Sequence, residues 1–349
     1  MGGKIRVLVV DDSAYMRVVL KDMLESNGNI IVIGTAKDGV EAVERAKSLA
    51  PDVILLDIQM PKIDGIATLK RIMKEAPTRV VMLSAMDKMD DQLPLRALEM
   101  GAVDFISKPS GPVSIDIVNF TDRISQVVVE AASTRVDALR RTMTPVPHQL
   151  RPPKPEKIQH KVIVIGASLG GPRALEFIIA SLPKGLPAPI FIVQHLPSEF
   201  SQSFAKRLSA AKGPHVELAE EGLRPEKGVA YVAPGGKHLK LSWKGASSLL
   251  MRLDDGDPVN FVKPSVDVLF KSAADSLGES VLAIVLTGMG EDGTSGALAV
   301  KNCGGRVIVQ DEATAVAPGM PKSVLDAGAA DKVVPLEKIP EEIVKFLEE

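Results

Sequence analysis

Short apolar runs recur along the first third of the chain, and each one ends in polar residues. Runs this short predict buried strands, and the amphipathic stretches between them predict helices. Strands that alternate with helices favour a parallel sheet with helices on both faces. The five expected strands are 5–10, 30–33, 53–56, 80–83 and 103–106.

The second half of the chain alternates in the same way. Strands are expected at 162–165, 190–193, 281–286 and 307–309, with a first helix at 172–181 and a closing helix at 339–347. Shorter segments with glycine turns predict a hairpin segment at one edge of this sheet. They are 216–218, 229–232, 239–243 and 247–253. This half is therefore predicted to be a doubly wound, mainly parallel α/β domain with an antiparallel hairpin segment.

A different pattern separates the two halves. Residues 121–141 have helical spacing, with Ile124, Val127, Val128 and Ala131 on one stripe. Residues 142–157 carry repeated prolines and no apolar period, which is typical of an extended, semi-rigid spacer. The spacer is either a passive tether or a docking segment that moves with the first domain. The predicted domains are 1–122 and 158–349, joined by a helical extension and linker at 123–157.

Composition narrows the possible functions. The net charge of −2 and the aromatic content of 3% argue against a nucleic-acid or anionic membrane partner. The single cysteine, Cys303, excludes an internal disulfide framework and suits a reducing compartment. The N-terminus becomes charged too soon for a signal peptide, and no apolar run is long enough to span a bilayer. A cytoplasmic protein is expected.

Polar side chains follow the strands of the first half where each strand ends. Asp11, Asp12, Asp57, Ser84 and Lys108 all fall at the carboxyl edge of the predicted sheet, where open α/β sheets bind ligands. Any one of them alone would be a helix cap or a solvated charge. Together, the clustered carboxylates need a hard cation such as Mg²⁺, and the lysine and hydroxyl suit an oxygen-rich ligand. This edge suits phosphoryl transfer onto a carboxylate.

The turn after the first strand of the second half has a distinct pattern. Residues 166–170, Gly-Ala-Ser-Leu-Gly, fit G-x-S-x-G, a sharp strand-to-helix turn that lifts Ser168 out of the sheet. Gly171-Pro172 then opens a helix. An ordinary glycine-rich turn and a dinucleotide-binding loop are the alternatives.

Two further reactive side chains follow separate strands of the same half. A serine needs an imidazole to accept its proton and a carboxylate to orient the imidazole, and His195 and Asp292 supply them. The glycines around Met289 leave backbone N–H groups for an oxyanion hole. His238 is the alternative base, and Asp292 alone could equally cap its helix. The order Ser, His, Asp differs from that of common α/β-hydrolases.

The first half resembles response-regulator receiver domains. The resemblance rests on VVDDS at 9–13, LLDIQMPKIDG at 55–65, LSA at 83–85 and GAVDFISKP at 101–109. It implies a flavodoxin-like (βα)5 fold with sheet order 2-1-3-4-5, and a histidine kinase as phosphodonor. The implied phosphoacceptor is Asp57, and the implied ligands of Mg²⁺ are Asp11, Asp12, Asp57 and the Gln59 carbonyl. Ser84 and Lys108 would contact the phosphoryl group. Phe105 takes the place of the switch aromatic.

The second half resembles the catalytic domain of chemotaxis protein-glutamate methylesterases. The resemblance rests on IGASLGGP at 165–172, VQHLP at 193–197, YVAPGGKHL at 231–239 and LTGMGEDG at 286–293. It implies Ser168 as nucleophile, His195 as base, Asp292 as its orienting carboxylate and the Met289 N–H in the oxyanion hole, without a cofactor. The implied substrates are methyl-accepting chemoreceptors, which a cytoplasmic monomer meets without membrane insertion.

The predicted function is a phosphorylation-activated serine hydrolase of two-component signalling. It would release methanol from glutamate methyl esters of chemoreceptors and deamidate their glutamines during chemotaxis adaptation. Our hypothesis is that the unphosphorylated receiver covers the Ser168 edge, and that phospho-Asp57 favours an open arrangement. A response regulator with a non-catalytic, partner-binding output domain is the alternative. A hydrolase of free esters also remains open, because the sequence shows no receptor-binding surface.

Overall fold

The computed structural model describes residues 3–85, 93–108, 115–137, 152, 161–245 and 248–349. The chain divides into two compact units, Met1–Arg141 and Thr142–Glu349. Among the residues described, no helix is both long and apolar enough to cross a membrane.

The first unit alternates strand and helix throughout. Its described strands form a sheet of order β2-β1-β3-β4-β5, and all neighbours run parallel. This is the sheet order expected from the sequence. The strands are β1 (Ile5–Val10), β2 (Ile30–Ala36), β3 (Val53–Asp57), β4 (Arg79–Ala85) and β5 (Asp104–Lys108), and the helices are α1 (Ala14–Ser26), α2 (Gly39–Leu49), α3 (Gly65–Glu75), α4 (Leu93–Glu99) and α5 (Ile115–Ala132).

Local sequence explains where these helices begin. The side chains of Ser13, Asp38 and Asp64 precede α1, α2 and α3 and accept hydrogen bonds from backbone N–H groups of the first turn. The central strands are almost fully buried, because helices pack on both of their faces. The strand ends that carry polar residues are thereby fixed at one edge.

The second unit is also an α/β sandwich. Its strands are β6 (Val162–Ala167), β7 (Ile190–Gln194), β8 (His215–Leu218), β9 (Val229–Val232), β10 (His238–Lys244), β11 (Ser248–Asp254), β12 (Val281–Val285), β13 (Arg306–Gln310) and β14 (Lys332–Val334). Its helices are α7 (Gly171–Ser181), α8 (Ser198–Ser209), α9 (Val266–Leu277), α10 (Thr294–Asn302), α11 (Gly319–Asp326) and α12 (Ile339–Glu348), with short 3₁₀ turns at Gly278–Ser280 and Leu336–Lys338.

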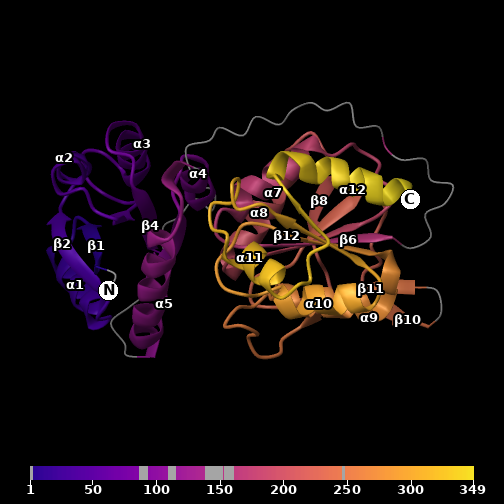
Figure 1. The fold of residues 1–349 in the computed structure, drawn as a ribbon. Coiled ribbons are helices and arrows are strands. Elements are labelled where there is room, and N and C mark those ends of the chain that lie inside the picture. The colour runs from indigo at the N-terminus through magenta and orange to yellow at the C-terminus, as the bar shows by residue number, and fades with distance from the viewer. Residues whose placement is uncertain (1–2, 86–92, 109–114, 138–151, 153–160, 246–247) are drawn as a thin grey trace. The chain divides into compact units, whose positions relative to one another are not determined.

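The main sheet of this unit has the order β14-β13-β12-β6-β7-β9-β8 among the described residues, with parallel pairing throughout. Figure 1 shows α7, α8 and α12 on one side of this sheet and α9 and α10 on the other. Gly166 lets α9 approach β6 closely, because a Cβ there would lie 2.3 Å from Cγ1 of Val266. The central strands β12, β6 and β7 are neighbours, so their carboxyl ends lie side by side.

The predicted hairpin segment is smaller than expected. β10 and β11 pair antiparallel and form a separate two-stranded sheet against α9, not an edge of the main sheet. β8 and β9, which we grouped with them, are parallel strands of the main sheet. Both have buried apolar residues, such as Val216 and Tyr231, and therefore need the cover of neighbouring layers.

The predicted helix at 121–141 is interrupted. α5 stops at Ala132, residues 136–137 are helical again, and the stripe of Ile124, Val127, Val128 and Ala131 is fully buried as expected. The rest of the helical extension beyond residue 137, and the proline-rich spacer except Pro152, lie outside the described residues.

Candidate active site and phosphorylation site

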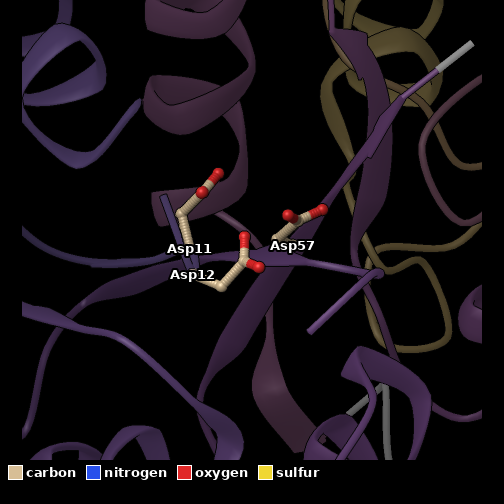
Figure 2. Close-up of side chains that lie close together, drawn as sticks. All are labelled: Asp11, Asp12 and Asp57. Atoms are coloured by element: carbon tan, nitrogen blue, oxygen red, sulfur yellow. The ribbon is translucent and has the colours of Figure 1, made fainter. Parts of the chain in front are cut away.

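Three carboxylates gather at the carboxyl edge of the first sheet. Asp11 and Asp12 follow β1, and Asp57 ends the neighbouring strand β3 (Figure 2). One carboxylate oxygen of each lies within 4.8 Å of the others. Asp11 and Asp57 are buried, whereas Asp12 is exposed. Three negative charges this close repel one another and form a donor set of oxygens that suits a hard cation.

Lys108 joins this cluster from the end of β5. Its Nζ lies 2.7 Å from Oδ2 of Asp11 and 2.8 Å from Oδ2 of Asp57. Burial alone would lower the pKa of Lys108, but the two carboxylates outweigh it and raise the pKa. Burial raises the pKa of the Asp57 carboxyl, although Lys108 opposes the change. The lysine is therefore charged and points at the carboxylates, as a group that neutralises a bound anion must.

The remaining predicted residues of this edge lie close by. Ser84 is buried in β4, in a strand that pairs with both β3 and β5. The Gln59 N–H donates to Oδ1 of Asp57 over 3.4 Å. Phe105 is buried in β5, three residues before Lys108. A side chain at Gly65 would place its Cβ 2.2 Å from the Asp57 carbonyl oxygen, so the glycine lets α3 begin against this edge.

In the second unit, Ser168 lies between two neighbouring strand ends. Ala167 and Gln194 are register partners in β6 and β7, so Ser168 and His195 leave the sheet next to each other. On the other side, the Ser168 N–H donates to the Thr287 carbonyl over 3.0 Å. Gly288 makes this approach possible, since a Cβ there would lie 2.9 Å from Cβ of Ser168.

His195 contacts Asp292 directly. Nε2 of the ring lies 2.8 Å from Oδ2 of the carboxylate, and both side chains are largely buried. A carboxylate only accepts hydrogen bonds, so Nε2 must carry the proton and Nδ1 is left with a lone pair. Nδ1 is thus the ring atom that is left to accept a proton, and the Ser168 hydroxyl makes no hydrogen bond to the described residues. In the serine-protease arrangement the two ring nitrogens have the opposite roles.

Asp292 is held by donors from the start of α9 and the loop before it. Ser265 Oγ donates to Oδ1 over 2.7 Å, and the backbone N–H groups of Val266 and Asp267 donate to Oδ2 and Oδ1 over 2.7 Å and 3.2 Å. Asn260 Nδ2 also donates to Oδ1, over 3.1 Å. Burial would raise the pKa of this carboxyl, but the hydrogen bonds from His195, Ser265 and Val266 lower it. Asp292 is therefore ionised and fixed in orientation.

His238, the alternative base, is engaged elsewhere. It is fully buried; its Nδ1 accepts from the Ser265 N–H over 3.1 Å, and its Nε2 lies 3.0 Å from the Asp257 carbonyl oxygen. Both ring nitrogens have hydrogen-bond partners, so His238 stabilises the loop that holds Asp292.

The turn after β12 carries the predicted oxyanion hole. Met289 is half-buried between Gly288 and Gly290, which has a φ of +79°. Gly288 is tied on both sides, since its N–H donates to the Ala317 carbonyl over 2.9 Å and its carbonyl accepts from the Met320 N–H over 2.9 Å. This fixes the turn beside Ser168.

Sequence reasoning did not single out Gln194, Asn260 or Ser265. Gln194 Nε2 donates to the carbonyls of Ser168 and His195 over 2.9 Å and 3.2 Å, so one buried amide ties the two segments together. Its position as a polar residue at the end of a buried strand was the available signal. Asn260 and Ser265 lie in a loop and at a helix start, where polar residues are ordinary.

Comparison with known protein families agrees with both units. The response regulator receiver domain family matches residues 7–118. The five-stranded fold and the acidic edge define the class: this is a response regulator, with a receiver domain joined to an α/β output domain.

The CheB methylesterase family matches residues 163–343, about half of the chain. The chain belongs to the CheB methylesterase family. It is 45% identical to the protein-glutamate methylesterase/protein-glutamine glutaminase of Thermotoga maritima over 98% of each chain. It is 43% identical to the protein of the same name from Halalkalibacterium halodurans over 99% of each chain. The crystal structure of the Thermotoga maritima CheB methylesterase catalytic domain is similar, with a TM-score of 0.53, 45% identity, and coverage of 54% of this chain and 99% of that one.

Proposed function

We propose that this chain is a protein-glutamate methylesterase and protein-glutamine glutaminase of chemoreceptors, switched on by phosphorylation of Asp57. The observation that carries the catalytic part is the bond from His195 Nε2 to Asp292, which leaves Nδ1 free to act as a base at the strand end next to that of Ser168. Full-length similarity to enzymes of this name supports the substrate class.

The reaction begins with proton transfer. His195 Nδ1 accepts the proton of the Ser168 hydroxyl as the oxygen attacks the γ-carbonyl carbon of the ester. The developing imidazolium is stabilised by Asp292, and the negative oxygen of the tetrahedral intermediate accepts a hydrogen bond from the Met289 N–H.

The intermediate then collapses. The C–O bond to the methoxy group breaks, the imidazolium protonates the leaving oxygen, and methanol departs. Water, deprotonated by His195, attacks the acyl-enzyme; the bond to the serine oxygen then breaks, the imidazolium returns its proton to that oxygen, and glutamate and free Ser168 result. With a glutamine side chain the leaving group is ammonia, and the other steps are the same.

The receiver domain regulates this reaction. Asp57 accepts a phosphoryl group from a histidine kinase, and Lys108 and Ser84 contact its oxygens. Asp11, Asp12, Asp57 and the Gln59 carbonyl would hold Mg²⁺, which would supply positive charge beside the phosphoryl group; the oxygen-only donor set at this edge fits the ion. Phe105 is the aromatic that responds to phosphorylation. We place the enzyme in the cytoplasm as a monomer that meets its membrane receptors peripherally.

Methanol release from a methylated receptor fragment tests the catalytic proposal. Wild-type protein should release methanol, and Ser168→Ala should release almost none while it still binds the fragment. A Ser168→Ala chain with wild-type turnover would refute Ser168 as nucleophile. Release from small esters alone would instead favour the free-ester hydrolase.

Phosphodonor dependence tests the regulation separately. A small-molecule phosphodonor should raise methanol release by the wild-type chain and leave Asp57→Ala unchanged. Equal rates with and without phosphodonor in the wild type would exclude activation through Asp57.

A further inference from the structure

The loop between β11 and α9 ends in a tight turn with an uncommon backbone. The N–H of Val259 donates to the Val262 carbonyl and the N–H of Val262 donates to the Val259 carbonyl, each over 3.1 Å. The two central residues, Asn260 and Phe261, both have left-handed φ angles, +53° and +63°. Such a turn favours Asn at its first central position and Gly at its second. Asn260 follows the rule, and Phe261 breaks it.

The turn is held rigidly at the active site. Asn260 Nδ2 donates to Oδ2 of Asp267 over 2.9 Å and to Oδ1 of Asp292 over 3.1 Å. Behind it, Lys263 Nζ donates to the Gly256 carbonyl over 3.2 Å, and His238 contacts the Asp257 carbonyl. The loop therefore has little freedom to turn the next side chain inward.

Phe261 is 96% exposed, the most exposed of the large apolar residues described. Its ring gains nothing from the fold, and its backbone conformation is one that an L side chain adopts only at a cost. A hydrogen-bonded turn that displays an aromatic ring in water is typical of a binding anchor, because the backbone that carries the ring is already ordered before a partner arrives.

The position of the ring indicates what it binds. Asn260 donates to Oδ1 of Asp292 and His195 contacts Oδ2, so the turn that carries Phe261 is attached to the carboxylate that holds the imidazole. With 96% of its surface exposed, the ring stands on the protein surface and not in a pocket that could enclose a small ester. A protein substrate that covers the surface around the site can contact such a ring, and a small ester bound at Ser168 does not need it.

We propose that Phe261 is a docking residue for the protein substrate, and that its ring packs on an apolar side chain of the receptor near the esterified glutamate. The proposal rests on the function proposed above. It makes Phe261 a determinant of protein over small-ester substrates, without a part in bond breaking.

The test compares two substrates in the full-length chain. One is a methylated, helical receptor fragment, and the other is an N-acetyl glutamate γ-methyl ester amide. Phe261→Gly is the main variant, since glycine accepts the left-handed backbone and keeps the turn folded. Phe261→Leu restores an apolar side chain. Leu223→Ala, an exposed apolar residue between β8 and β9, is the control.

For the receptor fragment, Phe261→Gly should lower kcat/KM by about tenfold to about a hundredfold, mainly through KM. Its rate on the small ester should not change, Phe261→Leu should recover most of the loss, and Leu223→Ala should match the wild type. In a Ser168→Ala background, Phe261→Gly should weaken binding of the fragment by a similar factor, which measures docking without turnover.

Three results would overturn the proposal. Unchanged receptor kinetics would show that the ring makes no contact with substrate. An equal loss on both substrates would show that the turn only positions Asp292. If the wild type self-associated and Phe261→Gly did not, the ring would instead bind a second copy of the chain. If the wild type released methanol from neither substrate, the proposed function itself would fail, and binding in the Ser168→Ala background would still report on the ring.

Discussion

Replacement of Asp292 by Asn tests the assignment of the two imidazole nitrogens. The variant keeps the shape of the side chain and converts one carboxylate oxygen into an NH₂ group, which donates. On the Oδ1 side, the new group would face the N–H donors of Asp267 and Asn260. On the Oδ2 side, it would face the N–H of Val266 and Nε2 of His195.

The structure decides between these two orientations. The Oδ1 side presents the Asp267 N–H, which cannot reverse, and the Asn260 amide, whose flip would turn its oxygen toward the Asp267 carboxylate. The Oδ2 side presents one donor that cannot reverse, the Val266 N–H, since an imidazole can exchange its tautomer. The NH₂ group should therefore take the Oδ2 position and donate to Nε2. His195 then carries its proton on Nδ1, where it cannot accept one from Ser168.

The expected loss of activity is large. The wrong tautomer in a related constellation lowers kcat by about 10⁴, so we expect a fall of about 10³ to 10⁴, which is about 4–5.5 kcal/mol of transition-state stabilisation. The buried N–H of Val266 loses its acceptor, so the free energy of unfolding should also fall by about 1–3 kcal/mol.

The assay combines kinetics with spectroscopy. Methanol release gives kcat, urea unfolding gives stability, and ¹⁵N NMR of the imidazole reports which nitrogen is protonated. Ser265→Ala is the control, because it removes one hydrogen bond to Asp292 and leaves its charge and the His195 contact. An Nδ1–H tautomer in the wild type, or Asp292→Asn with kcat close to wild type, would refute the reasoning.

Three further predictions follow from the same structure. Gln194→Met should lower kcat by about tenfold or more, because the carbonyls of Ser168 and His195 lose a shared donor; a kcat equal to wild type in steady-state assays would show that the backbone alone fixes them. Asp292 has a lowered pKa in the folded chain, so its contribution to stability is complete above its ordinary value of 3.8 and is lost as the pH falls below it. Urea unfolding over that range should show a steeper loss for wild type than for Asp292→Asn, and parallel curves would count against this. Mg²⁺ at about 100 times its Kd should stabilise the receiver by about 2.7 kcal/mol in thermal unfolding. The gain should shrink in Asp12→Asn, and a gain that is equal in both chains would place the ion elsewhere.

Much of both sites could be predicted because parallel sheets bring strand ends together. Asp11, Asp57 and Lys108 lie far apart in sequence, yet each follows a strand of one sheet, and Lys108 does contact both carboxylates. Likewise, Ser168, His195 and Asp292 follow β6, β7 and β12, which are neighbours. The apolar pattern locates the strands, and their ends then coincide without further information.

The remaining details depend on the path of the chain after it leaves the sheet. Asn260 and Ser265 hold Asp292 from a loop whose course is set by buried His238, and no local pattern encodes that contact. The sequence groups β8 and β9 with the hairpin because short strands with glycine turns have the same pattern in an antiparallel hairpin and at the edge of a parallel sheet. Their neighbours in the sheet, not their own residues, decide that they run parallel.

Because Gly166 has no side chain, α9 can pack against β6 in the position from which its first residues orient Asp292. Val266 rests against this glycine, and the same helix start supplies the donors that orient Asp292. A nascent or partly melted chain in which α9 has not docked therefore lacks the hydrogen bonds that orient Asp292 toward His195, even when the turn at Ser168 has formed.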